Sequence, residues 1–310
     1  MTSAADAKPA AAAGGVRSVK RHRVRRMRRG AAKATRSLGM DIVLFIFLGI
    51  LAAFMVVPIL FIVTSAFKPM EELFLFPPRL WVAHPTLDNF VQLSQLLSNM
   101  WVPFSRYLFN SVVVTVSATI GNVIVSSMAA YPLAKHEFKG KKVINEIIVL
   151  ALLFTPQVLY IPQYIIIANI GLVNNYLSLI LPVVQLTLGT FLMVQFMQQV
   201  PVSLLEAARI DGAGEMKIWW EIVMPTVKPA WLTLMILAFQ NIWSQTGNLF
   251  IYKENMKVLP SLTTQIQSGG LARAGASSAI MLVLMIPPIV LFQLSQKSVI
   301  ETMATSGIKD

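Results

Sequence analysis

The chain lacks cysteine altogether, and only 13% of its 310 residues are charged. Without a thiol it cannot form a disulfide, a thiolate zinc site or a cysteine nucleophile. Its three histidines, His22, His84 and His136, are scattered along the sequence, so neither a metal cluster nor a Ser/His/Asp arrangement is indicated. The G-x-x-x-x-G-K-[ST] motif of nucleotide-binding loops is also missing, because the Gly-Lys pair at residues 140–141 has no upstream glycine and no following hydroxyl. We therefore expect no catalytic residues, no bound cofactor and no metal in this chain.

Apolar residues are what the chain has in abundance, at 55% of the total and a mean hydropathy of +0.66. About a quarter of the residues in an average soluble domain are charged, so this composition fits a bilayer instead. Six apolar segments approach the roughly 20 residues that a helix needs to cross the hydrocarbon. They cover about 41–66, 108–134, 143–167, 176–199, 227–249 and 274–298. We expect an all-α polytopic membrane protein with six transmembrane helices, with a transmembrane domain at 39–300, an arm at 1–38 and a tail at 301–310.

The net charge of +12 is concentrated near the N-terminus, where residues 1–37 hold eleven of the 26 lysines and arginines. A nucleic-acid partner is not expected, because no aromatic residues are interleaved and no binding module is recognisable nearby. A cleavable signal peptide is disfavoured, since the apolar stretch that follows is far longer than the usual signal core. We expect a disordered cytoplasmic arm lying against the anionic headgroups of membrane lipids, each basic residue near the surface contributing on the order of 1 kcal/mol.

Basic residues also predict the orientation in the membrane. With the N-terminus inside, nineteen lysines and arginines fall in cytoplasmic segments and six in outside segments, with Lys228 at a boundary. This distribution follows the positive-inside rule, although the arm dominates the count. We therefore expect both termini, and the polar insert between the fourth and fifth segments, to lie in the cytoplasm.

The polar insert has the signals of a short helix. Ser203 and Glu206 have the spacing of a capping box, which predicts a helix that begins at Ser203. The two alanines after Glu206 would leave a face that another protein's backbone can approach closely, and Gly212 would end the helix. A second short helix is expected at residues 215–222. Spacing alone also fits an ordinary amphipathic linker helix, so the motif itself has to decide between the two interpretations.

The insert resembles a known motif. The run EAARIDGA at 206–213, followed by Met224-Pro225 and Pro229-Ala230, resembles the EAA loop of binding-protein-dependent ABC importer permeases. It is most similar to the carbohydrate-uptake group, which includes the smaller permease subunit of the maltose transporter. Met224 stands where leucine is usual, a change that keeps the side-chain volume. The resemblance implies a type I importer permease fold, in which an EAA loop at 201–225 supplies the coupling helix that docks on an ATPase. The ATPase-coupling residues that it implies are Glu206, Ala207, Ala208, Arg209, Asp211 and Gly212.

The resemblance also implies a set of partners. These are a second homologous permease subunit, two copies of a cytoplasmic ABC ATPase that would hold ATP and Mg, and an extracytoplasmic substrate-binding protein. The likeness runs from about Ser65 to about Phe250 and includes the long outside loop after the first span, which we expect to be partly folded. Composition alone would also allow that loop to be a membrane-interface segment. In the second long outside loop, Tyr252, Lys253 and Glu254 are candidate contacts for the binding protein.

The predicted spans contain neutral polar and aromatic residues but no Asp, Glu, Lys, Arg or His near their middles, which disfavours a proton- or sodium-coupled carrier. Amides can bond to hydroxyls, and aromatic rings can stack on the apolar face of a sugar. Asn241, Gln245 and Asn248 recur at i, i+4 and i+7, on one face of the fifth span. The candidates for the substrate path are Asn241, Trp243, Gln245, Gln157, Tyr160 and Gln163. Hydrogen bonding between helices is the alternative role of these amides. Two prolines beside the group in the third span predict a kinked or broken helix.

These observations together predict a transport subunit of the bacterial plasma membrane and not an enzyme. We expect the permease subunit of an ATP-driven importer, forming half of the path for a sugar or oligosaccharide. The alternatives are an ion-coupled secondary carrier, an ABC permease for a non-sugar solute, and a membrane-embedded enzyme or scaffold.

Overall fold

The structure is a computed structural model that describes residues 38–306, with side chains described from residue 39 to residue 296. All the regular elements in this part of the chain are helical, which confirms the predicted all-α class. The chain divides into two compact units, residues 1–54 and 55–310. Apart from Leu38, the predicted basic arm at 1–38 lies outside the described residues, as do the last four residues of the tail.

Four stretches are helical, apolar and long enough to cross a membrane, and the number rises to six if two sharply bent helix pairs each count as one span. The four are α1 (Leu38–Ala66), α4 (Phe104–Lys135), α7 (Leu177–Val184) together with α8 (Thr187–Gln198), and α14 (Ala274–Ser306) with the preceding turn η3 (Gly270–Arg273). The bent pairs are α5 (Lys141–Ala151) with α6 (Pro156–Asn169), at 111°, and Glu215–Thr226 with α12 (Lys228–Trp243), at 83°. Helix covers most of each predicted span, while the count of six stays a prediction.

Two of the predicted spans differ from straight helices. The third is broken between α5 and α6, as its prolines predicted, and Pro156 starts α6 because the first position of a helix needs no N–H partner. The fifth is shorter than predicted, since α12 ends at Trp243 and not at residue 249. Its last carbonyls are met by the Ser244 hydroxyl, which donates to the carbonyls of residues 240 and 241, and Gly247 then turns the chain at a φ of 69°.

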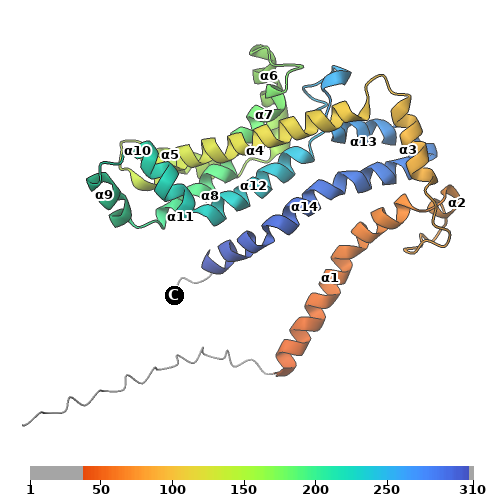
Figure 1. Cartoon of the computed structure of the whole chain (residues 1–310), viewed down its shortest axis with the longest axis horizontal. Coiled ribbons are helices and arrows are strands. Elements are labelled where there is room, and N and C mark those ends of the chain that lie inside the picture. The colour runs from red at the N-terminus through yellow and green to blue at the C-terminus, as the bar shows by residue number, and fades with distance from the viewer. Residues whose placement is uncertain (1–37, 307–310) are drawn as a thin grey trace, which may run out of the picture. The chain divides into compact units, whose positions relative to one another are not determined.

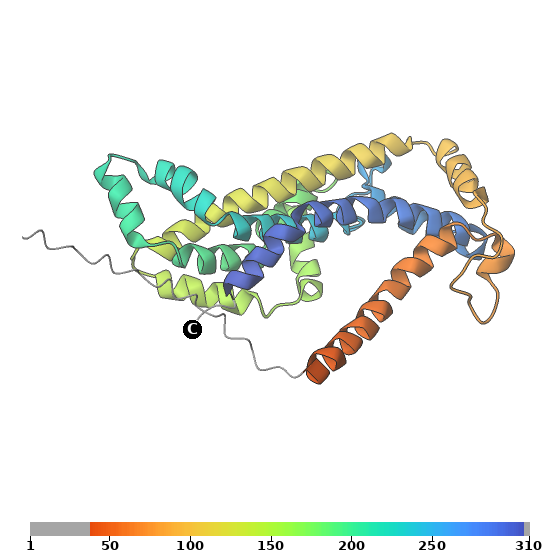
Figure 2. The same ribbon diagram turned by 60° about the horizontal axis from the view of Figure 1, so that its bottom comes forward.

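Within the second unit, α4 is the helix around which the others pack. α7, α8 and α12 lie against it, and α14 lies along α12 (Figures 1 and 2). The buried apolar side chains form three clusters. The first, here the loop core, consists of Val123, Ala130, Tyr131, Leu133, Met193, Val194, Met197, Val200, Leu205, Ala208, Ile218, Trp219, Val223, Met224, Val227, Ala230 and Leu234. The second, here the outer core, consists of Val114, Ala118, Ile167, Leu179, Val183, Ala238, Ile242, Phe250, Ile251 and Val258. The third consists of Leu93, Val102, Tyr107, Trp243, Leu259, Leu262, Ile266, Ala276, Ala279 and Ile280.

The two long loops that we predicted to lie outside the membrane contain short helices of their own. The first loop forms α2 (Met70–Leu73) and α3 (Asp88–Ser98), and the second forms the turn η2 (Glu254–Met256) and α13 (Leu259–Gln267). In the first loop the buried Asn89 amide donates to the carbonyls of residues 66 and 68, and the Glu72 carboxylate accepts from the N–H groups of residues 83 and 84. These bonds explain why the loop is folded, as predicted.

Candidate functional site

The polar insert forms the short helix that the sequence predicted, α9 (Val202–Ile210). Its start differs from the prediction. Pro201 occupies the N-cap position, and no side chain of the described residues donates or accepts the capping bond. Ser203 therefore lies inside the first turn, two residues past the N-cap position. The predicted capping box between Ser203 and Glu206 is wrong.

The end of α9 is at the predicted glycine. Gly212 has a φ of 80°, a left-handed conformation that costs glycine little. Its N–H donates to the Arg209 carbonyl at 3.0 Å, and the Ala213 N–H donates to the Ala208 carbonyl at 2.9 Å. This pair of bonds is a Schellman motif, which satisfies carbonyls that would otherwise lack partners. The chain leaves α9 in a tight, fully bonded turn, with Asp211 as the C-cap residue.

The second predicted helix of the insert is present and extends beyond residue 222. It consists of α10 (Glu215–Lys217), the π-helical turn η1 (Ile218–Val223) and α11 (Met224–Thr226). The wider π turn allows Ile218, Trp219 and Val223 all to be buried in the loop core. The insert is thereby anchored to the membrane domain at its C-terminal end.

Only two side chains attach α9 to the loop core. Leu205 is 1% exposed and Ala208 is 6% exposed. Ala208 is therefore part of the chain's own core, and the expectation that it lies on an open face is wrong, whereas Ala207 is exposed. The open side of the helix, here the docking face, consists of Ser203, Glu206, Ala207 and Ile210. Their i, i+3, i+4 and i+7 spacing puts them on one side of the helix. The 86% exposure of Ile210, an apolar side chain, was not anticipated from the motif.

A set of charged and aromatic side chains, here the Glu215 cluster, holds the turn between the two helices of the insert. Arg209 Nε donates to Glu215 Oε1 at 2.9 Å, Tyr131 Oη donates to Oε2 at 2.7 Å, and His136 Nε2 lies 3.4 Å from Oε2. The hydrogen bonds from Arg209 and then from Tyr131 hold the pKa of the Glu215 carboxyl below its ordinary value. Arg209, predicted from the motif as a coupling residue, is thus bonded within the chain.

The cluster was not found from the sequence. Tyr131 and Glu215 are 84 residues apart, and no spacing rule joins the end of α4 to the start of α10. The insert is fixed to α4 a second time, by Lys135. Its Nζ donates to the carbonyl of Gln198, the last residue of α8, at 3.1 Å and to that of Val200, two residues further on. α4 therefore braces the helix that leads into α9.

Two of the residues predicted for the substrate path are not free on a helix face. Trp243 is 7% exposed, stacks on Phe239 with ring centroids 5.5 Å apart, and donates from Nε1 to the Leu284 carbonyl at 3.1 Å. It is a core residue of this chain, and its assignment to the path stays a prediction. Gln245 lies beyond the end of α12, and its side chain donates to the exposed Asn241 amide oxygen at 2.9 Å. The expected row of three amides on one helix face is therefore not formed.

The small cavity beside these residues is no sugar site. Trp243 and Gln245 line it together with Ser111 and Thr115, and its volume is about 10 Å³. That is space for about one water molecule. The other candidates, Gln157, Tyr160 and Gln163, lie on α6, where the first two are exposed and the third is half-buried. Their role in substrate binding stays a prediction.

The second outside loop is held by Glu254, a predicted contact for the binding protein. Its carboxylate accepts from Tyr107 Oη at 2.5 Å and from Gln265 Nε2 at 2.7 Å, and it lies 2.6 Å from Lys257 Nζ. Burial raises the pKa of this carboxyl, but Lys257 and the two hydrogen bonds outweigh burial and lower it overall. Glu254 thus serves the chain's own fold. Tyr252 is the more exposed neighbour, at 56%.

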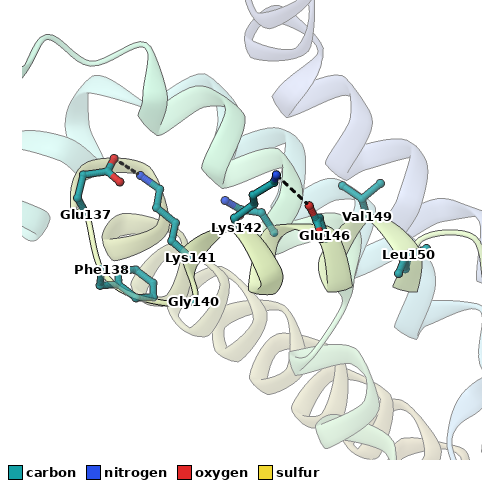
Figure 3. Close-up of a pocket in the computed structure, with 9 residues that line it drawn as sticks. Glu137, Phe138, Gly140, Lys141, Lys142, Glu146, Val149 and Leu150 are labelled. Atoms are coloured by element: carbon teal, nitrogen blue, oxygen red, sulfur yellow. Dashed lines mark hydrogen bonds and ion pairs between the residues drawn. The ribbon is translucent and has the colours of Figure 1, made fainter.

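An open groove of about 820 Å³ lies where α4 passes into α5 (Figure 3). Phe138, Val149 and Leu150 supply its apolar lining, and two ion pairs line it as well, Lys141 with Glu137 at 2.7 Å and Lys142 with Glu146 at 4.0 Å. The charges of its lining cancel. None of the residues predicted for coupling or for the substrate path lines this groove.

Comparison with known proteins shows the family of the chain. A family model described as "Binding-protein-dependent transport system inner membrane component" matches residues 37–304. The chain belongs to this family. It is a multi-pass membrane component of a transport system and not an enzyme, while the docking role of the insert stays a prediction.

This inner membrane component is similar to several curated permeases. The sn-glycerol-3-phosphate transport system permease protein UgpE of Yersinia enterocolitica is 32% identical, over 66% of this chain and 76% of that protein. The probable ABC transporter permease protein YurM of Bacillus subtilis is 32% identical, over 86% and 87%. The arabinooligosaccharides transport system permease protein AraQ of Halalkalibacterium halodurans is 28% identical, over 86% and 94%. These names agree with an ABC permease of the carbohydrate-uptake group.

The fold agrees with that of a solved importer. A chain of a bacterial ABC transporter involved in the import of the acidic polysaccharide alginate superimposes with a TM-score of 0.70 at 21% identity. The match covers 84% of this component and 98% of that chain. The arrangement of helices around α4 is therefore that of an ABC importer permease.

Proposed function

We propose that this chain is the permease subunit of an ATP-driven importer and forms half of the path for an oligosaccharide or a related polyhydroxylated solute. Its docking face on α9 couples it to a separate ATPase. The partners are a second homologous permease subunit, two copies of an ABC ATPase that hold ATP and Mg, and an external substrate-binding protein. Both termini and the EAA loop at 201–225 lie in the cytoplasm, in accord with the distribution of basic residues.

The observation that carries this proposal is the construction of α9. Its inner side is fixed to the loop core by Leu205 and Ala208, its last turn is a Schellman motif, and its next turn is clamped by Arg209 and Glu215. A helix fixed in this way moves as one body with α8 and the start of α12. Its outer side offers Glu206, a small Ala207 and an exposed Ile210 to a partner. Displacement of that face by an ATPase would therefore be passed to the spans.

The class of solute rests on the relatives and on the chemistry of the exposed side chains. The proteins to which the chain is similar are named for glycerol 3-phosphate, arabinooligosaccharides and alginate, which all carry several hydroxyl groups. Asn241, Gln157 and Tyr160 are exposed, and each can bond to hydroxyls. With a paired subunit supplying the other wall, they suit a polyhydroxylated solute.

The test is to reconstitute the chain with its partner subunits in vesicles and to measure ATP hydrolysis with and without the loaded binding protein. Glu206→Lys places a cation in the docking face without touching the core, so we expect stimulated hydrolysis and solute uptake to be lost. Glu137→Lys is the matched control. Its side chain is 90% exposed, it undergoes the same charge change, and it loses only a surface ion pair, which is worth at most about 1 kcal/mol.

Normal stimulation and uptake in Glu206→Lys would overturn the docking assignment. Equal losses in both variants would show that added charge, not the docking face, causes the defect. Uptake by the chain in vesicles that contain no ATPase would favour an ion-coupled carrier instead.

A further inference from the structure

A layer of buried polar side chains separates the loop core from the outer core. Thr119, Asn122 and Ser126 lie on one side of α4 and are 5%, 0% and 1% exposed. On either side of this layer, α4 contributes Ala118 to the outer core and residues from Val123 onward to the loop core. The same division runs through the neighbouring span, where α7 belongs to the outer core and α8 to the loop core.

The break between α7 and α8 coincides with this layer. α7 ends at Val184 and α8 begins at Thr187, and the regular α-helical pattern is interrupted between them, where the Leu186 N–H donates to the Val183 carbonyl three residues back at 3.1 Å. α4 and α12 pass the layer as continuous helices. The span made of α7 and α8 therefore transmits movement from the loop core to the outer core less well than α4 and α12 do, because an interrupted helix bends more easily than a continuous one.

Asn122 bridges that break from the side. Its Nδ2 donates to the carbonyl of Val183 at 2.8 Å and to that of Val184 at 3.1 Å. These are the last two residues of α7, and the Val183 carbonyl also accepts from the Leu186 N–H at 3.1 Å. A side chain of the continuous helix α4 thus holds the end of the interrupted one.

Two glycines bring the helices close enough for this contact. A Cβ at Gly121 would lie 2.8 Å from a methyl of Val184, and a Cβ at Gly189 would lie 2.8 Å from Ser126 Oγ and 3.1 Å from Asn122 Oδ1. No methyl group fits at either point without displacing its neighbours. The position of both halves of the broken span against α4 is therefore closely determined.

The layer is not built for greatest stability. Asn122 Oδ1, Thr119 Oγ1 and Ser126 Oγ are all buried without a hydrogen-bond partner among the described residues. An apolar side chain of the same shape avoids that cost, whereas a half-bonded buried amide incurs it. Because burying Asn122 in this way costs stability, we attribute its presence to the two carbonyls at the end of α7 that its amide binds.

From this geometry, and resting on the proposed function, we propose that Asn122 is a positioning residue that splints the α7–α8 break, so that movement of α9 reaches the outer half of the span. Without it, movement of α8 would be absorbed by bending at residues 185–186. ATP hydrolysis would then continue without productive transport.

The test compares Asn122→Leu with Ser126→Ala in the complete reconstituted transporter. Leucine keeps the approximate shape but donates nothing, so we expect the ratio of stimulated to basal ATP hydrolysis, and uptake per ATP, to fall at least about fivefold. Ser126→Ala removes an unpartnered hydroxyl from the same layer, and we expect the ratio to be unchanged. An unchanged ratio in Asn122→Leu would overturn the proposal.

An engineered disulfide between α4 and the end of α7 tests whether the loss in Asn122→Leu can be reversed. A Cβ at Gly121 would lie 4.0 Å from Val184 Cβ, which is within the range of a disulfide, and the chain has no other cysteine. In Asn122→Leu carrying Gly121→Cys and Val184→Cys, oxidation should restore the ratio and reduction should abolish it again. Failure of the oxidised form to recover would show that the loss has another origin.

A distance measurement separates this proposal from the proposed function. Spin labels at Leu177 on α7 and Leu204 on α9, both exposed and outside the docking face, report whether the two halves keep one separation. We expect a distribution at least about twice as broad in Asn122→Leu as in the parent or in Ser126→Ala. A wild-type complex without stimulated hydrolysis would refute the proposed function, while equal widths in all three proteins would refute the splint.

Discussion

The attachment of α9 by two side chains makes a sharp prediction for Leu205→Ala. An isolated helix of nine residues is marginal in water, because even good sequences need about 12–15 residues. α9 therefore depends on its contact with the loop core. Leu205 is 1% exposed, and Ala208 contributes only a methyl group.

The size of the effect follows from the burial. Truncation of a fully buried leucine to alanine costs about 2–5 kcal/mol. If the loss acts on α9 locally, about 2.7 kcal/mol raises the fraction of open helix about 100-fold, since 1.4 kcal/mol is a factor of ten. Hydrogen exchange of residues 202–213, measured by mass spectrometry on the full chain in nanodiscs, should accelerate by about that factor. Exchange in α4 should not change.

Leu204→Ala is the matched control, since it makes the same substitution on the same helix at a side chain that is 43% exposed. We expect its exchange to stay within about threefold of the parent, because surface substitutions usually change stability by no more than about 0.5 kcal/mol. Equal acceleration in the two variants would refute the idea that Leu205 holds α9. Acceleration throughout the chain would show that the loop core unfolds as one unit and that α9 has no separate attachment.

Two further predictions concern the turn after α9. Gly212→Ala should destabilise the turn by about 1–2 kcal/mol, because alanine is strained at a φ of 80°, even though no atom lies within 4 Å of the added Cβ. The measurement is hydrogen exchange at residues 208–213, which should become faster. The control is Gly214→Ala, which should have little effect because the φ of Gly214 is −73°. Because the folded pKa of Glu215 is lowered, its contribution to stability is present above the ordinary value of 4.5 and is lost as pH falls through the folded pKa. Hydrogen exchange of this turn, corrected for intrinsic rates, should therefore change little from pH 8 to pH 5 and become faster in more acidic buffer. Glu215→Gln should not show this increase at acid pH. An increase of the same size in Glu215→Gln would assign it to another group.

The parts of the fold that follow from local chemistry were predictable from the sequence. Apolar length located the helices, the prolines located the break before α6, and Gly212 located the end of α9, because these signals act over a few residues. The predicted capping box is wrong because the N-cap residue is Pro201, which leaves Ser203 inside the first turn of the helix.

What the sequence did not reveal depends on packing between distant segments. Trp243 is a residue type that can stack on sugars, but in the structure its ring stacks on Phe239 and its Nε1 donates to the Leu284 carbonyl. The bonds of Asn122 to the end of α7 span about 60 residues, and no periodicity indicates them. Side chains that tie one helix to another were therefore invisible until the helices were placed.

The separation of α9 into two independent sides has a consequence for how such transporters can diversify. Leu205 and Ala208 hold the helix, whereas Ser203, Glu206, Ala207 and Ile210 face away from the core. Substitutions on the outward side can accumulate without cost to insertion or folding. Under the proposed docking role, the ATPase partner can change independently of the membrane domain, and grafting these four side chains is a route to pair this permease with a different ATPase.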